Sequence, residues 1–203
     1  MYCVNDCLVR FKKTYTKIKE SGLLDNTYRI FVVLVGDYAP IYKLELDNYE
    51  KVDIILGNNP TGEMDSLRLL WDIANKYTCN ILYLHSKGVS RPHNENIEAW
   101  IAYMEYFSIY QYEKCLESLK YNDAVGVDFY TNPMPHFSGN FWWSNSDYIK
   151  QRSNYDPTLS SDIKDERWYC EFWLLDQPKF KVECLHQSGV DLYNTNYTNY
   201  EHS

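Results

Sequence analysis

The regular alternation of short apolar runs with amphipathic segments constrains the fold more than any other feature. The run YRIFVVLVG at 28–36 is rich in β-branched residues and ends at Gly36, which is typical of a strand buried on both faces. Similar runs lie at 51–57, 80–85, 123–129 and 179–185. Between them, apolar residues at helical spacing predict helices over 6–21, 61–77 and 94–120. This order predicts an α/β fold with a central mixed, mostly parallel sheet and helices on both faces.

Two helix ends have specific signals. Thr61 is the expected N-cap of the helix over 61–77, and Glu63 and Asp65 suit the positive end of its dipole. Gly22 is the expected stop of the first helix. No linker is evident before about residue 190, so we expect one domain over 1–190. The polar segment 191–203 is either a loose tail or the start of a linker to a further domain.

Composition excludes several classes of function. The net charge of −8 is spread without a basic block, which argues against a nucleic-acid partner. No segment approaches the roughly 18 apolar residues of a membrane span, and the first residues do not resemble a signal peptide. The six cysteines form no C-x-x-C pair, so we expect reduced thiols and a cytoplasmic location.

Polar residues collect where the predicted strands end. In an open α/β sheet, ligands bind outside the carboxyl ends of the strands. The residues at these ends are Asp37, Asn58, Glu63, His85, Lys87, Asp128 and His186. A single histidine at a strand end is more often structural, but two histidines with a lysine and glycine-bearing loops favour a site.

Two later segments each allow a structural and a functional interpretation. PHFSGNFWWSNSDYI at 135–149 is either a turn before a core aromatic strand or a wall for a sugar ring, with Ser138 and Asn140 as hydrogen-bonding groups. In DERWYCEFWLL at 165–175, Glu171 either pairs with Arg167 or serves as a catalytic base. Asp165 and Glu166 also suit the start of a helix.

The order of these motifs resembles a known family. SGLLDNTYRIFVVLVGD, ILYLHSKGVS, HFSGNFWWSNSDYI and RWYCEFWL occur in the order found in small glycosyltransferases of the GT-A fold. The sequence is most similar to the N-terminal glycosyltransferase domain of large chlorella-virus proteins. The resemblance covers roughly residues 2–190 and implies a GT-A-like, Rossmann-type sheet. For a viral protein, the expected location is the host cytoplasm.

The resemblance also implies roles for individual residues. It implies a UDP-sugar donor, a glycan or other hydroxyl acceptor, and Mn²⁺ or Mg²⁺ on the diphosphate. The implied nucleotide contacts are Tyr2, Asn5, Asp37, Asn58, Glu63, His85, Lys87, Ser188 and Gly189. The implied sugar or acceptor contacts are Ser138, Gly139, Asn140, Trp142 and Trp168. The chain departs from the family where most GT-A enzymes carry Asp-x-Asp, because His85-Ser86-Lys87 stands there.

The implied catalytic and metal-binding residues follow from the same comparison. His186 and His85 are the expected metal ligands, with Asp128 in reserve, and imidazole suits Mn²⁺ better than Mg²⁺. Lys87 would stabilise charge on the leaving diphosphate. Glu171 is the expected base of an inverting transfer, with Asp165 and Glu166 in reserve. Two alternatives are a non-catalytic nucleotide- or glycan-binding module on the same fold and a metal-dependent phosphohydrolase that uses both histidines.

Overall fold

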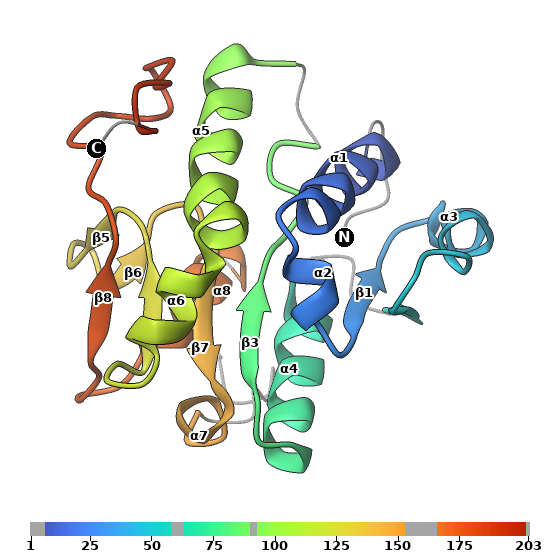
Figure 1. The fold of residues 1–203 in the computed structure, drawn as a ribbon, viewed down its shortest axis with the longest axis horizontal. Coiled ribbons are helices and arrows are strands. Elements are labelled where there is room, and N and C mark those ends of the chain that lie inside the picture. Colours follow the sequence, from blue (N-terminus) through green and yellow to red (C-terminus); the bar gives the residue numbers. More distant parts are fainter. Residues whose placement is uncertain (1–6, 58–62, 90–92, 153–165, 202–203) are drawn as a thin grey trace.

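The structure is a computed structural model that describes residues 7–57, 63–89, 93–152 and 166–201 (Figure 1). Its helices are α1 (Cys7–Glu20), α2 (Leu23–Asn26), α3 (Ala39–Leu46), α4 (Met64–Lys76), α5 (Glu95–Glu105), a π-helix (Tyr106–Tyr110), α6 (Tyr112–Ser118), α7 (Ser146–Ile149), α8 (Glu166–Phe172) and a 3₁₀ turn (Trp173–Leu175). Its strands are β1 (Ile30–Leu34), β2 (Val52–Leu56), β3 (Asn80–Tyr83), β4 (Ala124–Gly126), β5 (Phe129–Tyr130), β6 (His136–Phe137), β7 (Trp142–Asn145) and β8 (Val182–Cys184).

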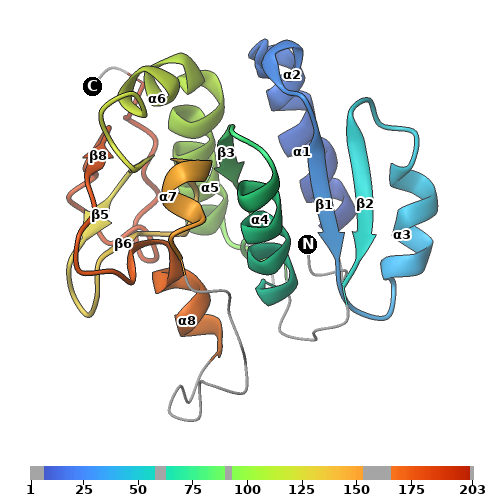
Figure 2. The ribbon, with the colours of Figure 1, turned by 90° about the horizontal axis from the view of Figure 1, so that it is seen from below.

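The strands form three small sheets within a mixed α/β fold. β1 and β2 pair in parallel, with Ile30 opposite Val52. The largest sheet has four strands in the order β3-β7-β4-β8, and β5 pairs with β6 beside it. All five strands expected from the sequence are present. In the β1–β2 sheet, β1 is the strand nearer to β3 (Figure 2). Ile30 of β1 packs in one hydrophobic cluster with Leu82 of β3 and with Leu84, the residue directly after β3.

The prediction of a mostly parallel sheet is wrong for the described strands. Only β1–β2 and β4–β8 are parallel, whereas β3–β7, β4–β7 and β5–β6 are antiparallel. The reason is that β7 follows the β5–β6 hairpin directly. A short connection of this kind reverses the chain, while a parallel neighbour needs a crossover of a dozen or more residues.

Alternating side chains divide the four-stranded sheet between two helical layers. Tyr83, Trp142 and Ala124 face a cluster that contains residues of α4, α7 and α8. Their neighbours Leu82, Trp143 and Val125 face a cluster with residues of α1, α2 and α6. Because side chains of a strand alternate between faces, each strand supplies both layers. Helices therefore cover both faces, as predicted.

The helices match the predicted segments with two local differences. Gly22 has a left-handed φ of 78°, which suits the stop after α1. α4 begins after Glu63, which occupies the N-cap without a side-chain hydrogen bond, and Thr61 lies outside the described residues. The expected helix over 94–120 changes to a π-helix at Tyr106–Tyr110. There Trp143 Nε1 donates to Ser108 O over 2.8 Å, so a backbone carbonyl of this helix accepts a hydrogen bond from a β7 side chain.

The chain after residue 190 packs on α5 and the π-helix. Leu192 and Tyr200 are buried in a cluster with Tyr103 and Phe107, and Figure 1 shows this segment beside α5. The five cysteines of the described chain, Cys7, Cys79, Cys115, Cys170 and Cys184, are free thiols, as expected. None of the described helices is both long and apolar enough to cross a membrane.

Candidate functional site

Glu63 is the centre of a hydrogen-bonded cluster at the carboxyl end of β3. Its Oε2 accepts from the Tyr83 hydroxyl at 3.1 Å and from Asn140 Nδ2 at 3.2 Å. Its Oε1 lies 3.6 Å from His85 Nδ1. We name these four residues the Glu63 cluster. Three of them were predicted site residues, and they come from three segments that are distant in the sequence.

The cluster has an outer and an inner layer. The side chains of His85 and Glu63 are 18% and 23% exposed, so a ligand can reach them. Tyr83 and Asn140 are buried beneath them. Burial raises the pKa of Tyr83 well above its usual value, and the Glu63 charge adds to this effect, so the phenol remains a donor. The buried pair therefore holds the exposed pair in place.

The hydrogen bonds of His85 define its tautomer. Nε2 lies 2.9 Å from Gly139 O, and a carbonyl only accepts, so Nε2 carries a proton. Nδ1 then faces the Glu63 carboxylate. An edge contact with Phe141, with ring centroids 5.3 Å apart, fixes the imidazole from the side.

Gly139 and Asn140 adopt the backbone conformation that the cluster requires. Both have left-handed φ angles, 87° and 60°. A Cβ on Gly139 would lie 2.4 Å from Met104 Sδ and 3.1 Å from Trp100 Nε1, so a side chain here would force Met104 to shift. The tight turn aims Asn140 inward, where Nδ2 also lies 3.3 Å from Cys170 O and Oδ1 accepts from Trp142 Nε1 at 2.8 Å.

The aromatic strand packs in the core, which was one of its two interpretations. Trp142 is 1% exposed and stacks on Tyr83 with ring centroids 4.9 Å apart, so it offers no ring face to a sugar. Lys87 lies nearby on the loop after β3, with Nζ 3.7 Å from the centroid of the Trp100 ring. A cation over an indole face is held by the ring quadrupole. The loop therefore carries a positive charge close to the Glu63 cluster.

A second cluster lies between β4 and the loop after β8. The buried Asp128 carboxylate accepts from the Ser188 N–H at 2.6 Å and from the Ser188 hydroxyl at 2.9 Å. Tyr103 Oη lies 3.0 Å from His186 Nδ1. Burial raises the pKa of Asp128, although the hydrogen bonds from Ser188 and the His186 charge act against it. Burial likewise raises the pKa of Tyr103.

The described residues do not bring the three predicted metal ligands into one group. His85 belongs to the Glu63 cluster, whereas Asp128 and His186 belong to the second cluster. Both Asp128 oxygens accept a hydrogen bond from Ser188. Within residues 7–57, 63–89, 93–152 and 166–201, no three His, Cys, Asp or Glu side chains are grouped as metal ligands would be.

Some of the other predicted site residues lie outside the described residues, and those whose burial the structure describes are exposed or half-buried. Tyr2, Asn5, Asn58 and Asp165 lie outside the described residues, and Glu166 and Trp168 are placed only as backbone of α8. Asp37 and Gly189 are exposed, and Ser138 is half-buried with its N–H donating to Asp128 O.

Glu171 is half-buried on α8, one residue after the carbonyl that lies beside Asn140. No hydrogen bond or ion pair joins its carboxylate to another described side chain. The predicted base therefore lies on an element that contacts the Glu63 cluster, but its carboxylate is not part of the cluster.

Tyr83 and Tyr103 were missed by sequence reasoning. Both are buried apolar-periodic residues of a strand and a helix, and their hydroxyl groups bond functional candidates. The one available signal for Tyr83 was its place near the carboxyl end of a predicted strand, two residues before His85.

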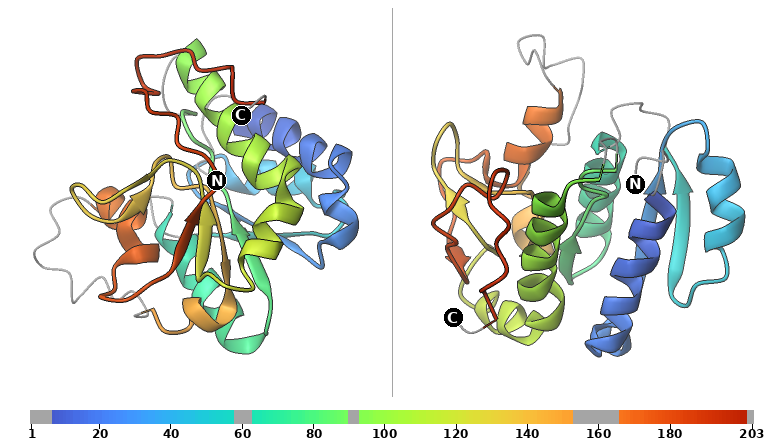
Figure 3. Two further views of the ribbon diagram at one scale, coloured as in Figure 1. Left: turned by 60° about the vertical axis from the view of Figure 1, so that its left-hand side comes forward. Right: turned by 90° about the horizontal axis from the view of Figure 1, so that it is seen from above.

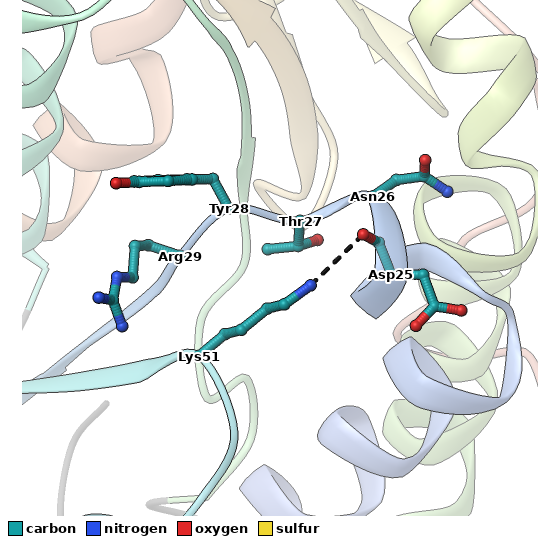
Figure 4. A pocket seen from close by; sticks show the side chains of 6 residues that line it. All are labelled: Asp25, Asn26, Thr27, Tyr28, Arg29 and Lys51. Atoms are coloured by element: carbon teal, nitrogen blue, oxygen red, sulfur yellow. Dashed lines mark hydrogen bonds between the residues drawn. The ribbon is translucent and has the colours of Figure 1, made fainter.

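A shallow pocket with a volume of about 580 Å³ lies elsewhere (Figure 4). Its lining residues are Asp25, Asn26, Thr27, Tyr28, Arg29 and Lys51. Lys51 Nζ donates to Leu24 O at 2.6 Å and to Asp25 O at 3.3 Å, so its charge is used to join β2 to α2. The pocket lies before β1, at the opposite end from the Glu63 cluster, and contains none of the predicted site residues.

The fold and the Glu63 cluster define an α/β protein with a polar site at strand ends. Over residues 14–157 the chain matches the model of a family described as a domain of unknown function, DUF8361, and it belongs to that family. No curated protein and no solved structure gives a significant match to the chain.

Proposed function

We propose that the protein is a glycosyltransferase that moves a sugar from a nucleoside diphosphate sugar, with a UDP-sugar favoured, to a hydroxyl of a glycan or other acceptor. The main support is the convergence of Glu63, His85 and Asn140 at the end of β3. Ligands of open α/β sheets bind at such ends. A GT-A-type core, to which the sequence motifs point, is part of the proposal.

The exposed groups of the cluster suit the donor. Cleavage of a nucleotide sugar leaves negative charge on a phosphate, and a cation in place before the reaction stabilises that charge. Lys87 on the loop after β3 supplies positive charge there. Glu63 Oε1 faces the His85 ring. The position of this carboxylate is fixed because its Oε2 accepts from Tyr83 and Asn140.

Two carboxylates compete for the role of base toward the acceptor hydroxyl. Glu171 is the residue implied by the family resemblance and favours an inverting transfer. Glu63 is the alternative that the geometry favours, since both of its hydrogen bonds from Tyr83 and Asn140 go to Oε2 and leave Oε1 the less occupied oxygen. A base must lie within hydrogen-bond reach of the proton that it removes. Glu63→Gln and Glu171→Gln therefore separate the two assignments.

The deciding experiment measures UDP release from a panel of UDP-sugars, with and without Mn²⁺ and with candidate acceptors. We expect release that depends on the donor and is lost in Lys87→Ala. Of the two carboxylate variants, the one that loses turnover while it still binds UDP identifies the base. Turnover with Mn²⁺ alone would support the predicted metal dependence.

The second candidate function is a nucleotide- or glycan-binding module without catalysis. It is favoured by the absence of Asp-x-Asp and by the buried, fully bonded state of Asn140 and Trp142. Thermal-shift titration with UDP, GDP, CDP and dTDP tests both functions, because a ligand that binds only the folded state raises its stability. A selective shift without turnover would favour the module, and no shift with any nucleotide would contradict both.

A further inference from the structure

A groove with a volume of about 380 Å³ lies between the start of α1, the loop after β3, the start of α5 and the C-terminal segment. Figure 3 shows α1 and α5 side by side around this region. None of the predicted site residues lines it. Its volume falls in the range of about 300–1,000 Å³ that small-molecule sites occupy.

Basic side chains dominate the polar lining of the groove. Arg10 and Lys13 come from α1, and His93 precedes α5. Glu98 is the carboxylate that faces them, and Arg10 Nη2 pairs with its Oε1. Burial raises the pKa of Glu98, but the hydrogen bond from Arg10 and the charges of Arg10, Lys13 and His93 outweigh it and lower the pKa. Glu98 is therefore ionised and neutralises one of the cations.

A surplus of positive charge is left for a ligand. The Arg10 side chain is 16% exposed and fixed by Glu98, whereas Lys13 is 60% exposed and lies 4.0 Å from Glu98 Oε2. An exposed ion pair at that distance contributes little, so Lys13 can turn toward an anion at small cost. His93 is exposed at the rim. This local surplus stands out in a chain whose net charge is −8.

The start of α5 borders the groove. Asn94 caps the helix, since its side chain accepts from the N–H groups of Asn96 and Ile97. This cap and the first-turn carboxylates of Glu95 and Glu98 already use the positive end of the 11-residue helix. The preference of the groove for an anion therefore comes from its basic side chains.

The remaining lining of the groove suits an organic group. Ile97 is buried at its wall, and Tyr193 is 42% exposed at its rim. The C-terminal segment holds Tyr193 in place, because Asn96 Nδ2 donates to Tyr193 O over 3.2 Å and the Tyr193 ring meets Trp100 edge-on. A half-exposed aromatic ring beside cations fits a ligand that has both a charged and an apolar part.

We propose that this groove binds a small phosphorylated organic molecule, with its phosphate on Lys13, His93 and Arg10 and its organic part against Tyr193. A phosphate accepts several hydrogen bonds at once from donors on different sides. Arg10 and Lys13 of α1 and His93 before α5 provide such donors. The inference does not rest on the proposed sugar transfer, because the groove shares no residue with the Glu63 cluster.

The test is calorimetric titration at about 0.15 M salt, where long-range charge effects are screened. The probes are glucose 6-phosphate, inorganic phosphate and glucose. We expect saturable binding of glucose 6-phosphate, weaker binding of phosphate and none of glucose. Lys13→Ala and His93→Ala should each weaken binding about tenfold, which corresponds to the loss of one charged hydrogen bond.

Lys12→Ala is the matched control, since Lys12 lies on the same helix but pairs with Glu45 outside the groove. It removes the same charge and should change affinity less than about twofold if contact with the groove matters. Equal weakening by Lys12→Ala, or the absence of saturable binding, would overturn the proposal. Phosphate binding as tight as glucose 6-phosphate would overturn the role of Tyr193.

A last comparison separates the groove from the Glu63 cluster. Glucose 6-phosphate should bind Glu63→Gln as it binds the unchanged protein, whether or not the variant retains UDP binding. Loss of glucose 6-phosphate binding in Glu63→Gln alone, with Lys13→Ala unaffected, would place the phosphate at the Glu63 cluster and reject the groove. A failed sugar-transfer assay leaves this outcome unchanged.

Discussion

Asn140 Nδ2 lies 3.2 Å from Glu63 Oε2, although 77 residues separate the two in the chain. The same amide also contacts the Cys170 carbonyl and the Trp142 indole. One side chain thus joins the start of α4, the strand β7 and the helix α8. The candidate site and the packing of three elements therefore depend on the same buried amide, and changes to it should affect both.

Asn140→Asp should destabilise the fold in a pH-dependent way. The change removes the donor to Glu63 and places two carboxylates in contact, while Trp142 Nε1 keeps an acceptor. We expect a loss of about 2–4 kcal/mol in the free energy of unfolding near neutral pH. The loss should shrink near pH 5, where one of the paired carboxylates takes up a proton. Urea unfolding at both pH values measures this.

The matched control for this change is Asn75→Asp, because Asn75 is an exposed residue of α4 whose amide donates to Trp71 O. It adds the same charge without a facing carboxylate and should cost less than about 1 kcal/mol. Equal losses for Asn140→Asp at both pH values would argue against repulsion between the two carboxylates.

Glu63→Gln should impair turnover more than folding. The amide oxygen can still accept from Tyr83 or Asn140, so the free energy of unfolding should fall by no more than about 1.5 kcal/mol. Loss of the charge that faces His85 removes an interaction made at the ligand-accessible edge. We expect the rate of UDP release to fall at least about tenfold, with UDP binding retained.

Glu113→Gln is the control for Glu63→Gln, because Glu113 is an exposed carboxylate in the first turn of α6. Its UDP release should match that of the unchanged protein. A Glu63→Gln variant that is fully active and unfolds at the usual denaturant concentration would remove Glu63 from the site.

Gly139→Ala should be more destabilising than Gly189→Ala. Both glycines have left-handed φ angles, 87° and 69°, so alanine costs about 1–2 kcal/mol of backbone energy at each. At Gly139 the new Cβ would also meet Met104 Sδ at 2.4 Å, whereas nothing lies within 4 Å at Gly189. We expect Gly139→Ala to cost at least about 1 kcal/mol more by urea unfolding. Equal costs would mean that Met104 moves aside freely.

The sequence was sufficient to predict the strands, the two helical layers and the gathering of Glu63 and His85 at one edge. The alternation of strand and helix and the position of each strand end carry that information. The partners of these residues could not be predicted in the same way. That Tyr83 bonds Glu63 depends on which face of β3 meets α4, and periodicity alone does not identify a hydrogen bond.

The division of the strand-end residues into two hydrogen-bonded clusters was also out of reach. Both follow predicted strands, so a single rim for all strand ends was the simplest expectation. In the structure β7 runs antiparallel between β3 and β4, so β3, β4 and β8 run in one direction, and Tyr83 and Gly126 both lie opposite Trp142. The strand ends therefore share one edge, as expected, and the two clusters lie on either side of β7. The direction of β7 depends on the β5–β6 hairpin, whose two-residue strands are too short to give a periodic signal.

Asp128→Asn should change how stability depends on pH. Burial raises the pKa of Asp128 in the folded protein, so the folded state holds this proton more tightly than the unfolded state. The stabilisation that comes from the bound proton is complete below the unfolded pKa near 3.8 and is lost as pH rises through the folded pKa. Each pH unit between the two pKa values amounts to about 1.4 kcal/mol.

Asparagine removes this titration while it preserves the local geometry. Its Oδ1 can accept from the Ser188 N–H, its Nδ2 can donate to the Ser188 hydroxyl, and it tolerates the φ of 48° at this position. Urea unfolding from about pH 4 to about pH 8 should show the variant gaining stability relative to the unchanged protein as pH rises, and then a plateau. The exposed Asp72→Asn should give a nearly constant difference. A relative stability of Asp128→Asn that falls with rising pH would mean that the hydrogen bonds from Ser188 outweigh the burial of the carboxylate.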